Sequence, residues 1–491
     1  MEKQLLSKST FIRSLQCSKA LYLYKYFPQL RDKISPEQKA LFSRGTNVGI
    51  AARDLFPGGV DASPDSHRDY TESIARTKRL MEDGVKIIYE AAFQYERVLA
   101  AIDILVFEND EWKAYEVKSS TRISPIYIMD ASLQYYVIVN SGVQLADISI
   151  ININNEYRKK GKVVWDNFFS IHSVLTEVKG NYDLVKNKIA EAKNIITNPK
   201  IPDVNIGEQC FAPYECDFKG HCWKNISKGS VFELSGISKA EQFNLYNSGV
   251  INIEAIPADY PLKKATELQV ECIKSNRPHI NKEAVKGFLE KLMYPLHFLD
   301  FESFMPAIPL FEGCKPYEHI PFQYSLHIQQ NDNSIIEHRE YLAQPGDPRK
   351  EFINCLLENI LPEGNIMVYS AAFERAILNN LKIQFPEHSK KIDSILSRIK
   401  DLMDVFENRW YYHPAMKGSY SIKNILPALV PELTYQNLQI NSGNIAMTVF
   451  ESLQNENNLH KIMDHREALL EYCKMDTWAM VKIVEKLRGF V

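Results

Sequence analysis

The stretch His297–Ser303 constrains the fold of this 491-residue chain more than any other segment. It is an apolar run in which Asp300 and Glu302 stand one residue apart, and such a run predicts a β-strand. Alternate side chains of a strand share a face, so both carboxylates point the same way. Two like charges on a buried face need compensation by a cation, an arginine or water. The pair is therefore either a site for a hard divalent ion such as Mg²⁺ or, more simply, a solvated pair of acids.

Further motifs follow this strand in a defined order. Residues 365–370 predict a short apolar strand, and the helical pattern directly after it carries Glu374. A second helical pattern, at about 465–487, places Tyr472 and Asp476 four residues apart and hence on one helix face. This order of acids and tyrosine resembles the DEDD exonucleases of the RNase H-like fold, in the subtype with a tyrosine four residues before the last aspartate.

That resemblance covers about residues 290–491 and implies a role for each of these side chains. The implied ligands of two Mg²⁺ or Mn²⁺ ions are Asp300, Glu302, Glu374 and Asp476. Tyr472 would orient the attacking water. The third acid of the family is usually aspartate, so Glu374 is a departure that changes the reach of this ligand.

Length and composition bound what the rest of the chain can be. A chain of 491 residues exceeds a single core, which predicts two or three domains. The net charge of −3 excludes a general attraction to polyanions, so a nucleic-acid surface would be a local groove. No apolar run approaches the roughly 20 residues needed to cross a bilayer, and the N-terminus lacks the apolar segment of a signal peptide. We therefore expect a cytoplasmic protein with no membrane partner.

The cysteines indicate a metal site. Cys210, Cys216 and Cys222 are separated by five residues each, and Cys17 lies in a predicted helix near the N-terminus. Disulfides are not expected in a reducing compartment. Zinc sites favour gaps of about two to four residues, whereas a cubane iron–sulfur cluster tolerates varied spacing. We predict a 4Fe-4S cluster on these four thiolates, with zinc or simple burial of the thiols as alternatives.

A second acidic site is predicted between these cysteines. Two apolar runs on either side of residues 109–111 predict a β-hairpin. The first carries Asp103, and the second carries Glu116 and Lys118 on a shared face. By themselves, Glu116 and Lys118 are also compatible with an exposed ion pair of little energetic value.

An aspartate followed by Glu-x-Lys after a turn resembles the core of the PD-(D/E)xK nucleases. Together with the cysteines, it resembles the iron–sulfur nucleases of the RecB type, in which the cluster joins the two ends of the nuclease domain. The resemblance implies that Asp103 and Glu116 bind Mg²⁺ or Mn²⁺, that Glu90 assists them, and that Lys118 positions or activates the water.

The helical segment that follows resembles the glutamine–tyrosine motif of the same group. It implies that Gln134 supports the site and that Tyr135 contacts nucleic acid. The histidine that often follows an early glycine in this group is missing after Gly45, which makes activity at this site less secure than the fold.

These motifs predict an α/β protein in three parts. Residues 1–225 would form a restriction-endonuclease-like PD-(D/E)xK domain with an iron–sulfur staple, and residues 286–491 an RNase H-like domain with a mixed sheet. Residues 226–285 would be a helical linker, either plain or of the helix-hairpin-helix kind. The order resembles an uncharacterised bacterial family that fuses these two nuclease modules.

The expected function is metal-dependent hydrolysis of DNA, with a 3′→5′ exonuclease site in the C-terminal domain and a second nuclease site in the N-terminal domain. One alternative is a nucleic-acid-binding or scaffold protein in which one or both folds are inactive. Another keeps the chemistry but has RNA as its substrate, because the contacts to the 2′-hydroxyl that decide sugar preference cannot be located in the sequence.

Overall fold

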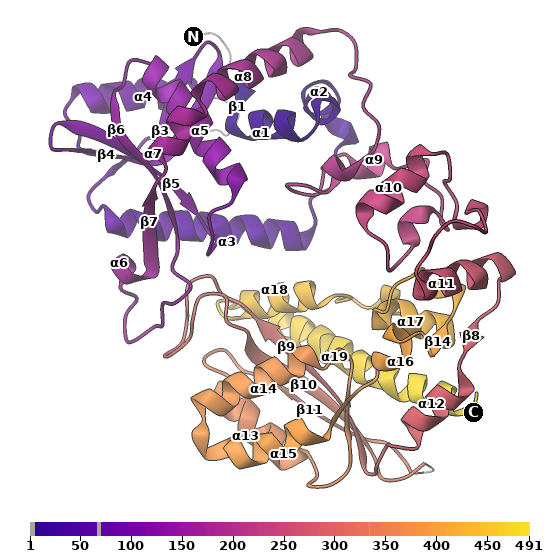
Figure 1. The fold of residues 1–491 in the computed structure, drawn as a ribbon. Coiled ribbons are helices and arrows are strands. Elements are labelled where there is room, and N and C mark those ends of the chain that lie inside the picture. The colour runs from indigo at the N-terminus through magenta and orange to yellow at the C-terminus, as the bar shows by residue number, and fades with distance from the viewer. Residues whose placement is uncertain (1–4, 66–69, 333) are drawn as a thin grey trace. The chain divides into compact units, whose positions relative to one another are not determined.

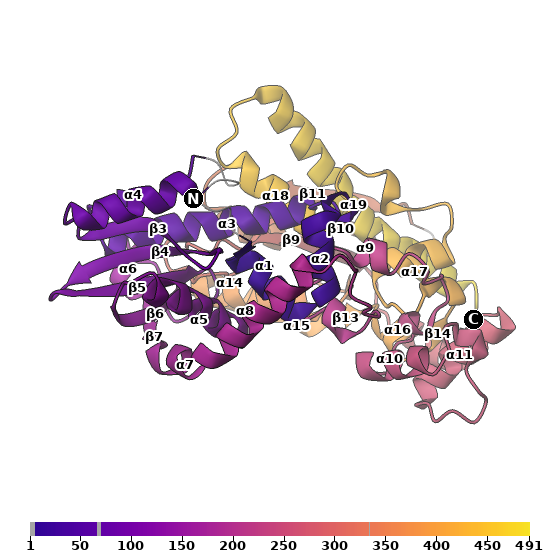
Figure 2. The same cartoon turned by 90° about the horizontal axis from the view of Figure 1, so that it is seen from above.

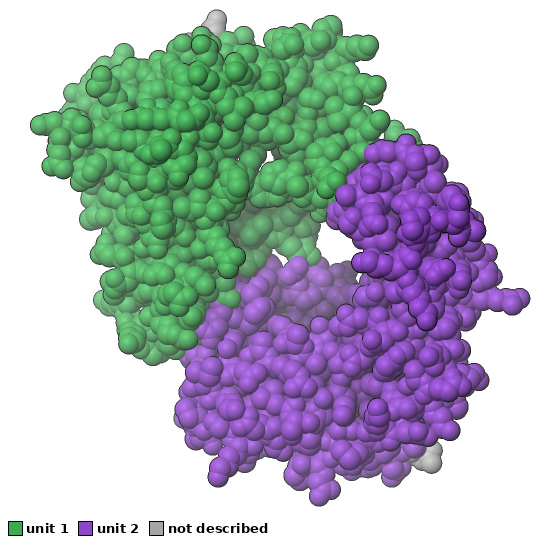
Figure 3. All heavy atoms as spheres, in the orientation of Figure 1, with its two compact units in different colours: residues 1–225, 306–317 green, residues 226–305, 318–491 purple. Residues whose placement is uncertain are grey.

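The computed structural model describes residues 5–65, 70–332 and 334–491. The chain divides into two compact units (Figures 1 and 3). Unit 1 comprises Met1–Asn225 and Pro306–Tyr317, and unit 2 comprises Ile226–Met305 and Glu318–Val491. Residues 226–285 thus lie within unit 2, and residues 306–317, which the sequence assigns to the C-terminal domain, belong to unit 1. Each unit is α/β with its own main sheet, which agrees with the predicted α/β class.

The sheet of unit 1 has the strand order β2-β3-β4-β5-β6-β7, and β1 pairs with β4. Its strands are β1 (Leu6–Ser7), β2 (Val60–Asp61), β3 (Ile87–Tyr95), β4 (Val98–Glu108), β5 (Glu111–Lys118), β6 (Leu145–Ile153) and β7 (Phe169–Ser173). β3, β4 and β5 form an antiparallel meander, and α5 (Pro125–Asn140) then connects β5 to the parallel strand β6. The predicted hairpin is confirmed, and its turn residues Asn109 and Asp110 adopt positive φ angles.

Helices cover both faces of this sheet, and α4 lies along β3 (Figure 2). The other helices of unit 1 are α1 (Lys8–Gln16), α2 (Ser18–Tyr26), α3 (Pro36–Ala52), α4 (Thr71–Glu82), α6 (Trp165–Phe168), α7 (Leu175–Gly180), α8 (Tyr182–Thr197) and α9 (Lys219–Cys222). The side chain of Ile102 joins the hydrophobic cluster under α1, α5 and α8, whereas Ile104 joins the cluster under α3 and α6. Ile102 and Ile104, which would share a face of a regular strand, therefore point to opposite faces of the sheet. The irregularity lies at Asp103, opposite Glu90 of β3, whose φ is 54°. Irregularities of this kind re-aim side chains beside functional sites.

The main sheet of unit 2 has the order β11-β10-β9-β12-β13. Its strands are β9 (Leu296–Phe304), β10 (Ile320–Gln329), β11 (Glu337–Leu342), β12 (Ile366–Val368) and β13 (Ile399–Asp401). β9, β10 and β11 are antiparallel, whereas β12 and β13 run parallel to β9. A small pair of strands, β8 (His279–Ile280) and β14 (Tyr411–Tyr412), ties the 226–285 segment to the rest of unit 2.

Helices lie on both faces of this sheet (Figure 1). The helices of unit 2 are α10 (Lys239–Asn247), α11 (Lys264–Ser275), α12 (Lys282–Leu289), α13 (Arg349–Asn359), α14 (Ala372–Gln384), α15 (Ser389–Arg398), α16 (Asp404–Glu407), α17 (Ile422–Leu429), α18 (Gly443–Leu453) and α19 (Leu459–Arg488). Of these, α10 and α11 belong to a separate small hydrophobic cluster. Leu299 and Phe301 of β9 pack into the core formed with α13, α14 and α15. The alternate residues Asp300 and Glu302 therefore face the side of α18 and α19, which confirms that they share a face. Within the ranges described, no helix is long and apolar enough to cross a membrane.

Candidate functional site

Three carboxylates converge in unit 2. β9 supplies Asp300 and Glu302, and α19 supplies Asp476. One oxygen from each lies within 4.8 Å of the others, and Glu302 and Asp476 are each 7% exposed. The three line a cavity of about 400 Å³. In the part of the chain that the structure describes, this is the one group of three or more His, Cys, Asp or Glu side chains that meets so closely.

Burial and mutual repulsion make these acids hard to ionise. Burial, followed by the neighbouring carboxylates, raises the pKa of Asp300 and of Glu302 well above the usual range. Burial also raises the pKa of Asp476 to about 6, although the Tyr435 hydroxyl donates to its Oδ1 at 2.7 Å. A divalent cation would offset this repulsion, and an all-oxygen donor set is the kind that Mg²⁺ and Mn²⁺ prefer. The triad therefore fits such an ion.

Tyr472 lies one helical turn before Asp476 on α19, and its side chain lines the same cavity. The Nζ of Lys423, on α17, donates to the Tyr472 hydroxyl at 3.1 Å. The structure thus brings the predicted tyrosine to the acids and adds a cation beside it. Sequence reasoning gave neither Lys423 nor Tyr435 a role among the acids, because both lie in segments without a local signal that connects them to the motifs.

Glu374 lies beside the triad but is not part of it. It is buried in the first turn of α14, and its Oε2 has no hydrogen-bond partner. Burial raises its pKa to about 8, and its charge in turn raises the pKa of Asp300 and Glu302. Asp401 fixes the turn before α14 by accepting hydrogen bonds from the backbone N–H groups of Ser370 (3.0 Å) and Ala371 (2.7 Å). The role of Glu374 as a metal ligand stays a prediction.

These carboxyl groups predict a pH-dependent stabilisation by metal. The folded pKa values of Asp476 (about 6) and Glu374 (about 8) lie above the usual values of about 4, so the metal-free protein loses stability as the pH rises from about 4 to about 8. A cation that binds the ionised acids restores it. We expect saturating Mn²⁺ to raise the Tm by about 5 °C or more at pH 8. The shift should be much smaller at pH 5, and differential scanning calorimetry with and without Mn²⁺ measures both. Equal shifts at the two pH values would contradict the carboxylate origin.

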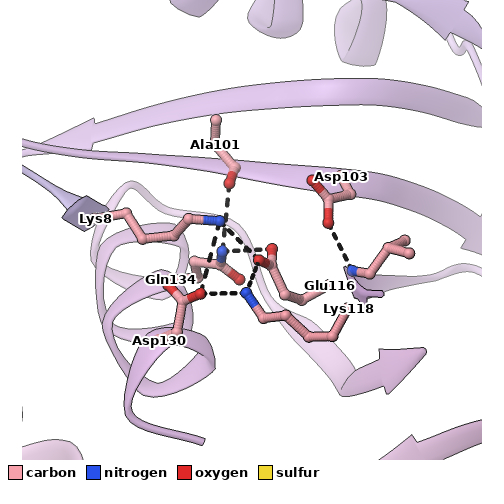
Figure 4. Close-up of polar contacts among 8 residues, drawn as sticks. Lys8, Ala101, Asp103, Glu116, Lys118, Asp130 and Gln134 are labelled. Carbon is pink, nitrogen blue, oxygen red and sulfur yellow. Dashed lines mark hydrogen bonds and ion pairs between the residues drawn. The ribbon is translucent and has the colours of Figure 1, made fainter. Parts of the chain in front are cut away.

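A second set of charged groups surrounds Glu116 at the end of β5 in unit 1 (Figure 4). Its Oε1 accepts hydrogen bonds from Lys8 (2.7 Å) and Lys118 (2.6 Å), and its Oε2 accepts one from the Nε2 of Gln134 (2.6 Å). Lys118 also donates to the Oδ2 of Asp130 at 2.5 Å. Although burial by itself would raise the pKa of Glu116, Lys118 and Lys8 depress it far below the usual range. Glu116 is thus a compensated carboxylate, unlike the acids of unit 2.

Asp103 and Glu90 lie on the neighbouring strands. The Oδ2 of Asp103 accepts a hydrogen bond from the backbone N–H of Val117 at 2.6 Å, and burial followed by Glu116 raises its pKa to about 8. Glu90 lies 3.5 Å from a guanidinium nitrogen of Arg53, and burial raises its pKa as well. The structure therefore gathers Asp103, Glu116, Lys118 and Gln134 in one place.

Sequence reasoning missed Lys8 and Asp130, which complete this site. Lys8 lies 108 positions before Glu116, so no local spacing connects the two residues. Asp130 lies four residues before Gln134, and this helical spacing was the signal that could have identified it. Tyr135 follows Gln134 on α5, but its side chain packs against the hydrophobic core of unit 1. Its contact with nucleic acid stays a prediction.

The predicted cluster ligands line one small cavity of unit 1. They are Cys17, Cys210, Cys216 and Cys222, all of them free thiols. The loop that carries the last three is attached to the N-terminal helices. Gln16 donates to the carbonyl oxygens of Gln209 (2.8 Å) and Tyr214 (2.6 Å), and Arg13 forms an ion pair with Asp217 (2.9 Å). Burial raises the pKa of Cys216 to about 11.

One segment of the chain matches a known family model. Residues 297–421 match a domain of unknown function, DUF2779. This segment begins within β9 and contains Asp300, Glu302 and Glu374, and it ends before α17.

The chain is also similar to two curated bacterial proteins. It is 23% identical over 227 residues to the uncharacterized MG366 homolog of Mycoplasma pneumoniae, and the aligned region covers 42% of this chain and 34% of that protein. It is 25% identical over 279 residues to the uncharacterized protein UU173 of Ureaplasma parvum, and the aligned region covers 52% of this chain and 39% of that protein. The chain thus spans well under half the length of the curated relatives that it matches.

Proposed function

We propose that this protein is a metal-dependent nuclease and that unit 2 hydrolyses DNA from its 3′ end. The observation that carries the proposal is the convergence of Asp300, Glu302 and Asp476 within 4.8 Å of one another in a cavity. The strand order β11-β10-β9-β12-β13 supports it, because the RNase H-like fold expected from the motifs places its acids on a central strand and a C-terminal helix.

Different residues of this site would bind metal, orient the water and contact the substrate. The three carboxylates would hold divalent ions, and such ions activate a water and offset the charge that develops on the leaving oxygen. Tyr472, held by Lys423, presents its hydroxyl to the same cavity and would orient the water. The apolar side chains of Phe373 and Met447 line the same cavity beside the acids, and the terminal base and sugar of the substrate would pack against them.

Unit 1 supports a second nuclease site of the RecB-like PD-(D/E)xK type. The meander β3-β4-β5, followed by α5 and β6, places Asp103, Glu116 and Lys118 on adjacent strands and Gln134 on the helix beside them. This is the arrangement that the motif implies. DNA is the proposed substrate of both units.

The cavity lined by all four cysteines supports a metal centre on these thiols. The gaps of five residues between Cys210, Cys216 and Cys222 favour a 4Fe-4S cluster over zinc, which prefers gaps of about two to four residues. A cubane spreads its ligands over four irons and accommodates the wider spacing.

A nucleic-acid-binding protein without turnover is the second candidate, and one observation favours it. Glu374, which would be the fourth ligand, lies outside the group formed by the other three acids. An incomplete ligand set can retain affinity for a phosphate chain while it loses the geometry for hydrolysis.

The test is an assay of purified protein on single-stranded oligonucleotides labelled at the 5′ end, in Mn²⁺ and in EDTA. A ladder of products that shorten one nucleotide at a time in Mn²⁺, absent in EDTA, is the expected result. Retarded migration of intact DNA without shortening would select the binding protein instead. Parallel reactions with RNA of the same sequence decide the sugar preference.

A further inference from the structure

The acidic site of unit 1 already contains its own cations. Both oxygens of Glu116 are occupied by donors of the same unit, namely Lys8 and Lys118 on Oε1 and Gln134 on Oε2 (Figure 4). Lys8 also lies 3.7 Å from the Oδ2 of Asp130. A divalent ion at Oε1 of Glu116 would be a third cation on an oxygen that already accepts hydrogen bonds from two ammonium groups, so it would have to displace one of them. Lys8 is the more exposed of the two, at 33% against 15% for Lys118.

Lys8 is held in this position by the backbone before it. It is the first residue of α1, directly after β1, which pairs with β4. The backbone N–H of Ser7 donates to the Oγ1 of Thr10 at 2.7 Å and closes the start of the helix. The backbone just before Lys8 is therefore held by pairing with β4, the strand that carries Asp103. The side chain of Lys8 is 33% exposed.

Two residues of this site also carry unpaired buried oxygens. The Oδ1 of Asp130 and the Oε1 of Gln134 are buried and have no hydrogen-bond partner, and both residues are at least nine-tenths buried. Unpaired buried oxygens of this kind cost free energy, and a bound cation would satisfy them. Lys8 also lines a cavity of about 620 Å³ together with Lys118 and Asp130, which gives its side chain space into which to withdraw.

We propose that Lys8 is an internal counter-ion that closes the acidic site of unit 1 to divalent metal, and that metal binds at Glu116 only when Lys8 withdraws into the adjoining cavity. The two acidic sites of the chain then differ before metal binds. At the triad of unit 2, the neighbouring Lys423 donates hydrogen bonds to the Tyr472 hydroxyl and the Asn441 carbonyl, and among the described residues no hydrogen bond or ion pair places an ammonium on the three carboxylates. The triad would therefore take up metal directly, whereas the site of unit 1 would be gated. The gate regulates the second nuclease site and so rests on the function proposed for unit 1.

The experiment counts bound Mn²⁺ by electron paramagnetic resonance of the free ion, with the 491-residue chain carrying Asp300→Asn and Asp476→Asn to remove the triad of unit 2. In this background, Lys8→Ala should tighten Mn²⁺ binding by about tenfold or more, because a competing cation is gone. Adding Glu116→Gln to Lys8→Ala should abolish the gain. The matched control is Lys39→Ala, which removes an exposed lysine of α3 in the same unit and should leave Mn²⁺ affinity unchanged.

Two results would overturn the gate. Equal Mn²⁺ affinity with Lys8 and with Lys8→Ala would show that the ammonium does not exclude the ion, and weaker binding in Lys8→Ala would make Lys8 a helper. Circular dichroism verifies the fold of each variant, and Lys8→Gln, which keeps a hydrogen-bond donor without the charge, decides the matter if Lys8→Ala fails to fold. The measurement needs no turnover, so an inactive unit 2 in the oligonucleotide assay would refute the exonuclease and leave the gate to be judged separately.

Discussion

We expect Asp300→Asn to lower the proposed release of nucleotides from a 3′ end by about 10³-fold or more, the largest effect of any single substitution. Asparagine has the shape of aspartate but lacks the charge that a divalent ion requires. The same substitution removes one member of a buried group of repelling carboxylates, whose pKa values are raised. The metal-free protein should therefore be at least as stable as the wild type at pH 8, while the stabilisation by Mn²⁺ disappears.

This pairing of lost activity with retained stability separates a role in metal binding from a role in folding. The measurements are single-turnover rates on a labelled oligonucleotide and the Tm in EDTA and in Mn²⁺. Asp464→Asn is the matched control, since it removes an exposed carboxylate from the same helix that carries Asp476. Asp464→Asn should leave both rate and Tm unchanged. An Asp300→Asn variant that degrades DNA at the wild-type rate would remove unit 2 from the catalytic proposal.

Cys216→Ser should remove the visible absorption of the protein and destabilise unit 1, with a fall in Tm of about 10 °C or more, because ligand loss and domain stability are coupled. Cys216 is buried and packs with Ala20, Leu23 and Phe218, so the cluster would join the cysteine loop to the N-terminal helices. Serine has nearly the same volume, so the effect would not come from a cavity. Iron and sulfide analysis after anaerobic purification is the direct measurement, with about four irons per chain expected in the wild type.

Cys272→Ser provides the control for Cys216→Ser. Cys272 is similarly buried, at 6% exposure against 8% for Cys216, but lies in unit 2. Its replacement should cost little stability and leave the iron content unchanged. A colourless wild-type protein that contains stoichiometric zinc would refute the cluster and select the alternative, and the same Cys216→Ser variant would then report the loss of zinc.

Local periodicity accounts for much of the fold and for part of the candidate sites. The alternation in His297–Ser303 predicts a strand with Asp300 and Glu302 on one face, and β9 confirms both points. The four-residue spacing of Tyr472 and Asp476 likewise places both on the inner face of α19, where they are buried. These features follow from backbone geometry with periods of about two and 3.6 residues, so a short window contains them.

Contacts between distant segments could not be predicted in this way. Tyr435 reaches Asp476 across 41 positions, and Lys423 reaches Tyr472 across 49, because loops without periodicity bring α17 and its neighbouring segments to the cavity. Glu374 also shows the limit of motif order, since its position after a strand does not bring its carboxylate into the triad.

The sequence by itself determined which residues carry charge and which of them share a strand or helix face. Only the tertiary structure decided the electrostatic state of each group. The acids of unit 2 repel one another in a buried cavity, whereas Glu116 of unit 1 is neutralised by Lys8 and Lys118. The physical reason is that charge compensation acts over a few ångströms in space, and the path of the chain brings Lys8 within 2.7 Å of a carboxylate 108 residues away.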